Sequence, residues 1–101
     1  MNTANLQLEG LMMALAAMNN LLVTKGLASS DEVAGALERA EQTVLGDHRT
    51  EELDPAQRDA IAFPIRLLRL ANNGSSESDT QSFSELAKLV GQTKTGYNDQ
   101  Q

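Results

Sequence analysis

Apolar residues recur every three or four positions through the first quarter of the chain, a spacing typical of one face of an α-helix. They form a continuous seam of Leu8, Leu11, Leu15, Met18 and Leu22. Further apolar residues lie off this seam: Met12, Met13, Leu21 and Val23. The pattern predicts a helix from about Ala4 to Lys25, ended by Gly26. A helix that is apolar on more than one side is either central in its domain or shared with a partner chain.

Two further amphipathic stretches each follow a helix-start signal. Ser29 and Glu32 form a capping-box pattern, and the helix that they open should stop at Gly46. Its predicted inward stripe is Val33, Leu37, Ala40 and Val44. Asp54 and Pro55 suit the cap and the first residue of a third helix, which Asn73 and Gly74 should terminate.

Pro64 lies inside the third predicted helix. Proline lacks a backbone donor and clashes with the preceding turn. We therefore expect a kink near residues 60–64, the alternative being two short helices with a break at Phe63.

A shorter fourth helix is predicted from about Ser82, with Glu85 three residues later. Its inward residues would be Phe83, Leu86, Ala87 and Val90. Between the helices, residues 47–53 are expected to form a polar connector and residues 75–81 a solvated linker, and residues 92–101 a flexible polar tail. The chain thus reads as one all-α domain over residues 1–91, a small antiparallel bundle of three main helices plus a shorter C-terminal helix.

The composition favours helices and indicates that a second chain contributes to the stability of the fold. Of the 101 residues, 41% are hydrophobic and only 3% aromatic, and none is cysteine. Leu and Ala dominate the hydrophobic residues, and both are strong helix formers. Without disulfides, so small a core depends on helix packing. We therefore expect a homodimer in which the first helix supplies the interface: Leu8, Met12, Met13, Leu15, Met18 and Leu22.

Some residues of the first helix have two interpretations. Met12, Met13 and Met18 could form an adaptable binding surface. We favour the other interpretation, in which they fill gaps in the core or support self-association. Asn19 and Asn20 either fix the register of a helix pair or face water.

The net charge of −6 is unevenly distributed. Residues 29–59 carry nine acidic residues and three arginines, a net charge of −6, whereas residues 60–74 carry only Arg66 and Arg69. Nothing here resembles the basic cluster that nucleic acids or anionic membranes require. The apolar run from Leu11 to Met18 is short for a membrane span, and no basic residue precedes Lys25 as a secretory signal would require. A cytoplasmic protein without nucleic-acid or membrane partners is expected.

One cluster offers possible chemistry. His48 is the only histidine, and it stands near Asp47 and Glu51. A histidine among carboxylates suits a divalent metal or acid–base work. The spacing matches no metal motif, and a solvated loop is the favoured interpretation. We expect neither catalysis nor a bound cofactor.

A second cluster is a possible partner site. Arg66 and Arg69 are three residues apart, and therefore neighbours on one helix face near Phe63. Arginine and aromatic residues are favoured at interfaces. The alternative, which we weight more heavily, is that both arginines pair with the acidic second helix or the connector. The leading functional hypothesis is a non-catalytic protein-interaction or adaptor module that self-associates, and its rival is a ligand-binding, metal-binding or enzyme-like site at His48.

The stretch LLVTKGLASSDEVAGALERAE resembles a passage common to many unrelated bacterial helical domains: a helix that ends in Lys-Gly, followed by a capped acidic helix. The resemblance covers about a fifth of the chain and includes no catalytic residue. It indicates a bacterial helical domain and assigns no family.

Overall fold

The computed structural model describes residues 3–73 and 82–93, and within these ranges the protein is helical without any strand. The elements are α1 (Thr3–Thr24), α2 (Ser30–Leu45), α3 (His48–Glu51), α4 (Pro55–Asn73) and α5 (Phe83–Thr93). The predicted all-α class is therefore confirmed.

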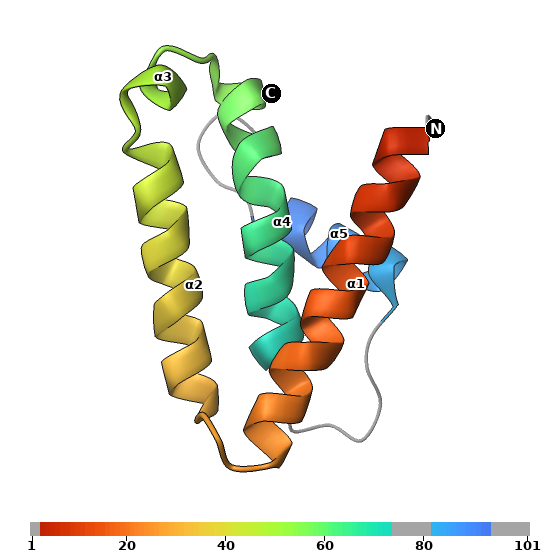
Figure 1. The fold of residues 1–101 in the computed structure, drawn as a ribbon. Helices are drawn as coiled ribbons and strands as arrows, with labels where there is room; N and C mark the ends of the chain where they lie inside the picture. Colours follow the sequence, from red (N-terminus) through yellow and green to blue (C-terminus); the bar gives the residue numbers. More distant parts are fainter. Residues whose placement is uncertain (1–2, 74–81, 94–101) are drawn as a thin grey trace.

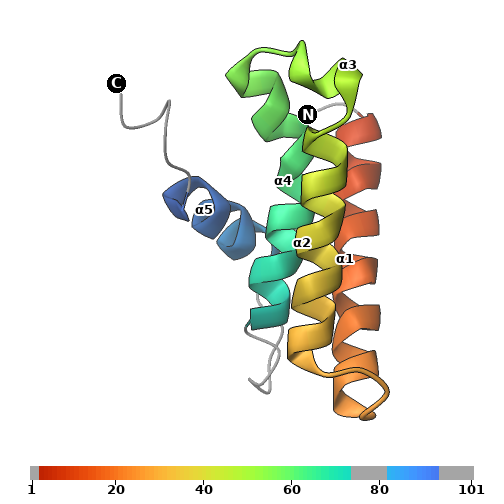
Figure 2. The ribbon, with the colours of Figure 1, turned by 90° about the vertical axis from the view of Figure 1, so that its left-hand side faces the viewer.

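Helix α4 lies at the centre of the molecule. It packs against α1, α2 and α5, and α1 and α2 flank it on opposite sides (Figure 1). Helices α1 and α4 run in the same direction, and α2 runs opposite to both (Figure 1). Helix α5 crosses the others at a steep angle (Figure 2). Of the two alternatives for the first helix, the central position is not the one found, because α1 lies at an edge and has α4 as its main neighbour.

The helix boundaries follow local sequence signals. Helix α1 ends before Gly26, whose φ of +75° is a left-handed conformation that glycine adopts readily. At the start of α2, the Ser29 amide donates to Glu32 Oε1 (2.7 Å) and the Glu32 amide donates to Ser29 Oγ (3.0 Å). This is the predicted capping box, and Gly46 caps the other end of α2 as predicted.

Helices α4 and α5 begin with the same reciprocal pattern. Asp54 and Gln57 exchange equivalent bonds at the start of α4. Ser82 and Glu85 do so at the start of α5. Hydrogen bonds from the Ser82 amide and then from its hydroxyl lower the pKa of Glu85 below its ordinary value.

Replacing Ser29 with alanine should lower the free energy of unfolding by about 1 kcal/mol, because the start of α2 loses its side-chain acceptor. Urea unfolding followed by circular dichroism would measure the change. Thr43→Ala, at an exposed position inside the same helix, is the matched control and should raise the stability slightly, by about 0.5 kcal/mol, because alanine is the better helix former. Equal losses in the two variants would contradict a capping role for Ser29.

Two local expectations need correction, and one alternative is excluded. The polar connector contains the short helix α3, whose start is capped by the Asp47 side chain accepting from the Arg49 amide at 2.8 Å. Helix α4 continues through Pro64, so the division into two short helices is wrong. Helix α5 continues past Gly91 to Thr93. The predicted linker over 75–81, and the predicted tail beyond residue 93, lie outside the described residues.

The predicted inward stripe of α2 is only partly buried. Val33 is buried, Leu37 and Val44 are half-buried, and Ala40 is exposed. Helix α2 also contacts α4 through ion pairs of its Glu41, which are described below.

The hydrophobic core forms where α1, α4 and α5 meet. Its buried members are Met12, Leu67, Leu86 and Val90. The rings of Phe63 and Phe83 pack edge to face beside them, with centroids 6.2 Å apart. The core thus uses only one side of α1, and this determines which of its apolar residues remain exposed.

Candidate interaction surface

Helix α1 meets the rest of the chain along a narrow stripe. Met12 and Ala16 are its buried residues, and Met13 packs against the core beside Met12. Residues four apart lie one turn above each other on the same face of a helix. Only that face is covered by the described residues of the chain.

The predicted seam of α1 lies outside this stripe. We use the term α1 seam for Leu8, Leu11, Leu15, Met18 and Leu22. Their exposed fractions run from 38% for Leu22 to 56% for Leu11 and Met18. Leu6 and Leu21 are exposed as well, and so is Leu27, which lies just beyond the end of the helix. Helix α1 forms an edge of the molecule in both ribbon views (Figures 1 and 2). Exposed apolar runs of this kind are typical of surfaces that bind a protein or a membrane.

The exposed side of α1 carries no charge. Glu9 is the only ionisable side chain within Thr3–Thr24, and it is half-buried. An outer helix of a soluble domain normally turns charged residues toward water. By length and composition alone, α1 could also cross a membrane, although the same test is passed by core helices and by signal sequences. The expectation of no membrane partner therefore stays a prediction.

The six residues predicted for the dimer interface divide into two groups. Leu8, Leu15, Met18 and Leu22 belong to the exposed α1 seam, as does Leu11. Met12 is 7% exposed and Met13 packs on the core, so these two contribute to folding within one chain. The favoured core interpretation thus fits Met12 and Met13. Asn19 and Asn20 are both half-buried.

The arginines predicted for partner binding are engaged within the chain. The carboxylate of Glu41 on α2 accepts from Arg66 Nε at 3.0 Å and from Arg69 Nη1 at 2.9 Å. Arg66 also donates to Asp59 Oδ1 at 3.0 Å. Burial alone would lower the pKa of Arg66, but the hydrogen bonds and charges of Glu41 and Asp59 raise it overall. Pairing with the acidic second helix, the alternative weighed from the sequence, is the arrangement found.

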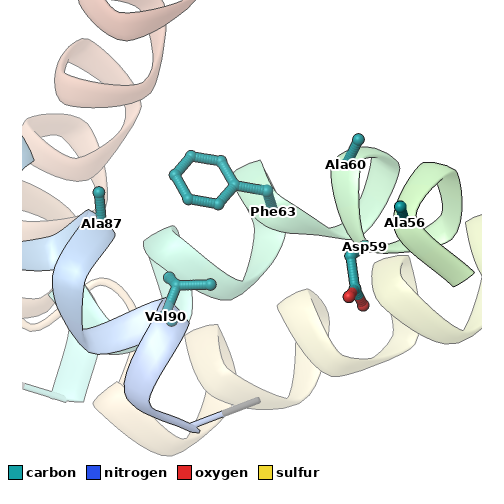
Figure 3. Close-up of a pocket in the computed structure, with 7 residues that line it drawn as sticks. Ala56, Asp59, Ala60, Phe63, Ala87 and Val90 are labelled. Carbon is teal, nitrogen blue, oxygen red and sulfur yellow. The ribbon is translucent and has the colours of Figure 1, made fainter. Parts of the chain in front are cut away.

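The third predicted partner residue, Phe63, lines a shallow groove between α4 and α5 (Figure 3). The groove has a volume of about 350 Å³, and its walls are Ala56, Asp59, Ala60, Phe63, Ala87, Val90 and Gly91. Asp59 points away from Phe63 toward α2 (Figure 3), and its carboxylate pairs with Arg66, which lies on α4 as well. Sequence reasoning missed this groove. Its only signal was the four-residue spacing of small residues in Ala56 and Ala60, and in Ala87 and Gly91.

The His48 cluster shows no metal-binding geometry. His48 is exposed in α3, and the Asp47 carboxylate caps that helix while lying 3.7 Å from Arg49 Nε. In the parts of the chain that the structure describes, no three His, Cys, Asp or Glu side chains are placed to hold a metal ion. A local capping role accounts for the orientation of Asp47.

Comparisons of the chain with protein-family models, curated proteins and solved structures gave no match.

Proposed function

We propose that this protein is a non-catalytic interaction module that forms a homodimer through the α1 seam. The observation that carries the proposal is the exposure of the seam: five large apolar side chains, spaced three and four residues apart, are each at least 38% exposed. This spacing is the one by which two helices pack side by side. A two-fold pairing needs a surface that complements itself, and an uncharged apolar seam meets that requirement.

The charge distribution supports a second copy as the occupant. Two chains of net charge −6 repel each other, so contact is favoured where charge is absent. The charged residues of 3–28 are Glu9 and Lys25, which cancel, whereas the acidic residues concentrate in 29–59. Helix α2, which begins that acidic region, lies across α4 from α1 (Figure 1). Pairing through the uncharged side of α1 therefore brings together the parts of the two chains that carry the least charge.

The groove on α4 and α5 supports a non-catalytic role. Its described lining is mostly alanine and other apolar side chains, and its carboxylate, Asp59, is ion-paired with Arg66. Catalysis needs convergent polar groups in a pocket. This groove does not gather them.

The test is the mass of the chain in solution, by light scattering on a size-exclusion column across a dilution series. We expect about 22 kDa, twice the chain mass of 10.9 kDa, with dissociation on dilution. Leu11→Lys and Met18→Lys should each weaken association at least about tenfold, because each dimer then buries two charges in an apolar contact. Both residues are 56% exposed, so the monomer should stay folded by circular dichroism.

Ala36→Lys is the matched control, since it adds the same charge at an exposed position of α2. This variant should associate like the parent. A mass of 10.9 kDa at every concentration, or a dimer indifferent to both seam variants, would contradict the proposal. In that case, binding to phosphatidylcholine vesicles that Leu11→Lys abolishes would assign the seam to a membrane instead.

A further inference from the structure

We infer that the two copies pair with their α1 helices antiparallel, and that Leu15 lies at the two-fold axis. This inference rests on the proposed homodimer and specifies its geometry. Leu8 of each copy would then lie opposite Leu22 of the other, and Leu11 beside Met18 of the other. Each chain would contribute the same five seam side chains to the contact.

The α1 seam is nearly symmetric about its middle. Leu8 and Leu22 each lie seven residues from Leu15, while Leu11 lies four residues before it and Met18 three residues after it. Reversing the helix about Leu15 therefore exchanges Leu8 with Leu22, returns Leu15 to its own position, and brings Leu11 and Met18 within one residue of each other's positions. A seam of this kind interdigitates with its own reversed copy without losing a contact at either end.

The residue types in the seam give no preference for a parallel pair. Parallel two-stranded coiled coils favour β-branched residues at one of their two alternating seam positions. Here those positions are Leu8, Leu15 and Leu22 in one set and Leu11 and Met18 in the other, all without β-branching. The exposed side of α1 also lacks the flanking charges that fix a parallel register.

Helix electrostatics then favour the antiparallel arrangement. The N-terminal end of a helix carries partial positive charge and its C-terminal end partial negative charge. Antiparallel α1 helices place the positive end of each beside the negative end of the other. A parallel pair places like ends together over a helix of 22 residues, about 33 Å long.

Cysteine cross-linking tests the orientation directly, because the chain contains no native cysteine. Leu8→Cys protein would be mixed with isotope-labelled Leu22→Cys protein in equal amounts and oxidised. Disulfide-linked pairs would then be weighed by mass spectrometry. A disulfide requires Cα atoms about 4.4–6.8 Å apart, so only seam residues that face each other join efficiently. We expect the mixed 8–22 disulfide to exceed either same-residue disulfide roughly tenfold or more, against about twofold for random pairing.

Leu15→Cys is the companion variant, since it should cross-link efficiently to its own copy at the two-fold axis. Dominant same-residue disulfides at 8 and 22 would overturn the antiparallel arrangement and leave the homodimer standing. Failure of Leu15→Cys to cross-link in a chain that still weighs about 22 kDa would overturn the register. A mass of 10.9 kDa for the unmodified chain would overturn the proposed dimer itself.

Discussion

Replacing Leu67 with alanine should lower the free energy of unfolding by about 3 kcal/mol and the melting temperature by roughly 15 °C. Leu67 has no exposed surface and stands on α4 where α1 and α5 join the core. Truncation removes buried methyl groups and leaves a cavity that three helices must share. A domain of this size has only about 5–15 kcal/mol of stability in total, so this is a large fraction.

Urea unfolding followed by circular dichroism would measure the loss, at one fixed protein concentration because association adds apparent stability. Ile61→Ala is the matched control, since it makes a similar truncation on the same helix at a side chain that is 37% exposed. We expect less than about 1 kcal/mol there. Similar losses in both variants would show that Leu67 does not hold the three helices together.

The helix boundaries could be predicted because their causes are local. Ser29 and Glu32, or Ser82 and Glu85, satisfy each other's backbone groups within one turn, and Gly26 supplies its own conformation. Nothing distant is needed for these features. The short helix α3 escaped prediction because four residues are too few to produce a periodic pattern.

The role of α1 could be predicted only in part. Its apolar residues showed that more than one side needs cover, but they could not show which neighbour covers each side. Helix α4 occupies the central position instead, with Leu67 in the core and Arg66 facing the acidic α2. Helix α1 was left with Met12 buried and its seam outside. The predicted interface set mixed these two faces because sequence spacing alone does not tell them apart.

The ion pairs between residues far apart in the chain could not be predicted from the sequence for a different reason. Arg66 and Arg69 find Glu41 25 and 28 residues away, across the turn that contains α3. Several acidic residues of α2 were equally plausible partners from composition alone. The choice of Glu41 depends on how α2 and α4 rotate against each other. The groove beside Phe63 likewise exists only because α5 packs across α4.

In the proposed dimer, the two sides of α1 support different processes. The inner side, through Met12, stabilises the single chain, and the outer side is available for association. Substitutions on the inner side should therefore change unfolding, and substitutions on the seam should change mass. This separation explains how a small domain uses one helix that is apolar almost all round.

Replacing Glu41 with alanine should lower the free energy of unfolding by about 2 kcal/mol. The Glu41 side chain is 15% exposed and bridges Arg66 and Arg69. Its removal leaves Arg69 without this bond and Arg66 with Asp59, in a contact that is partly shielded from water. The loss should exceed that of a surface ion pair, at about 0–1 kcal/mol, and fall short of that of a fully buried one, at about 3–5 kcal/mol.

Glu38→Ala is the matched control, because Glu38 is an exposed residue of the same type in the same helix. Its stability change should stay within about 0.5 kcal/mol. Glu41→Gln separates the effect of charge from that of hydrogen bonding. The uncharged amide keeps a single acceptor oxygen, so only one of the two arginines retains a full-strength hydrogen bond. An intermediate loss for Glu41→Gln would support a charge-assisted bridge. A Glu41→Ala variant as stable as Glu38→Ala would mean that the pairs of Glu41 with Arg66 and Arg69 do not stabilise the contact between α2 and α4.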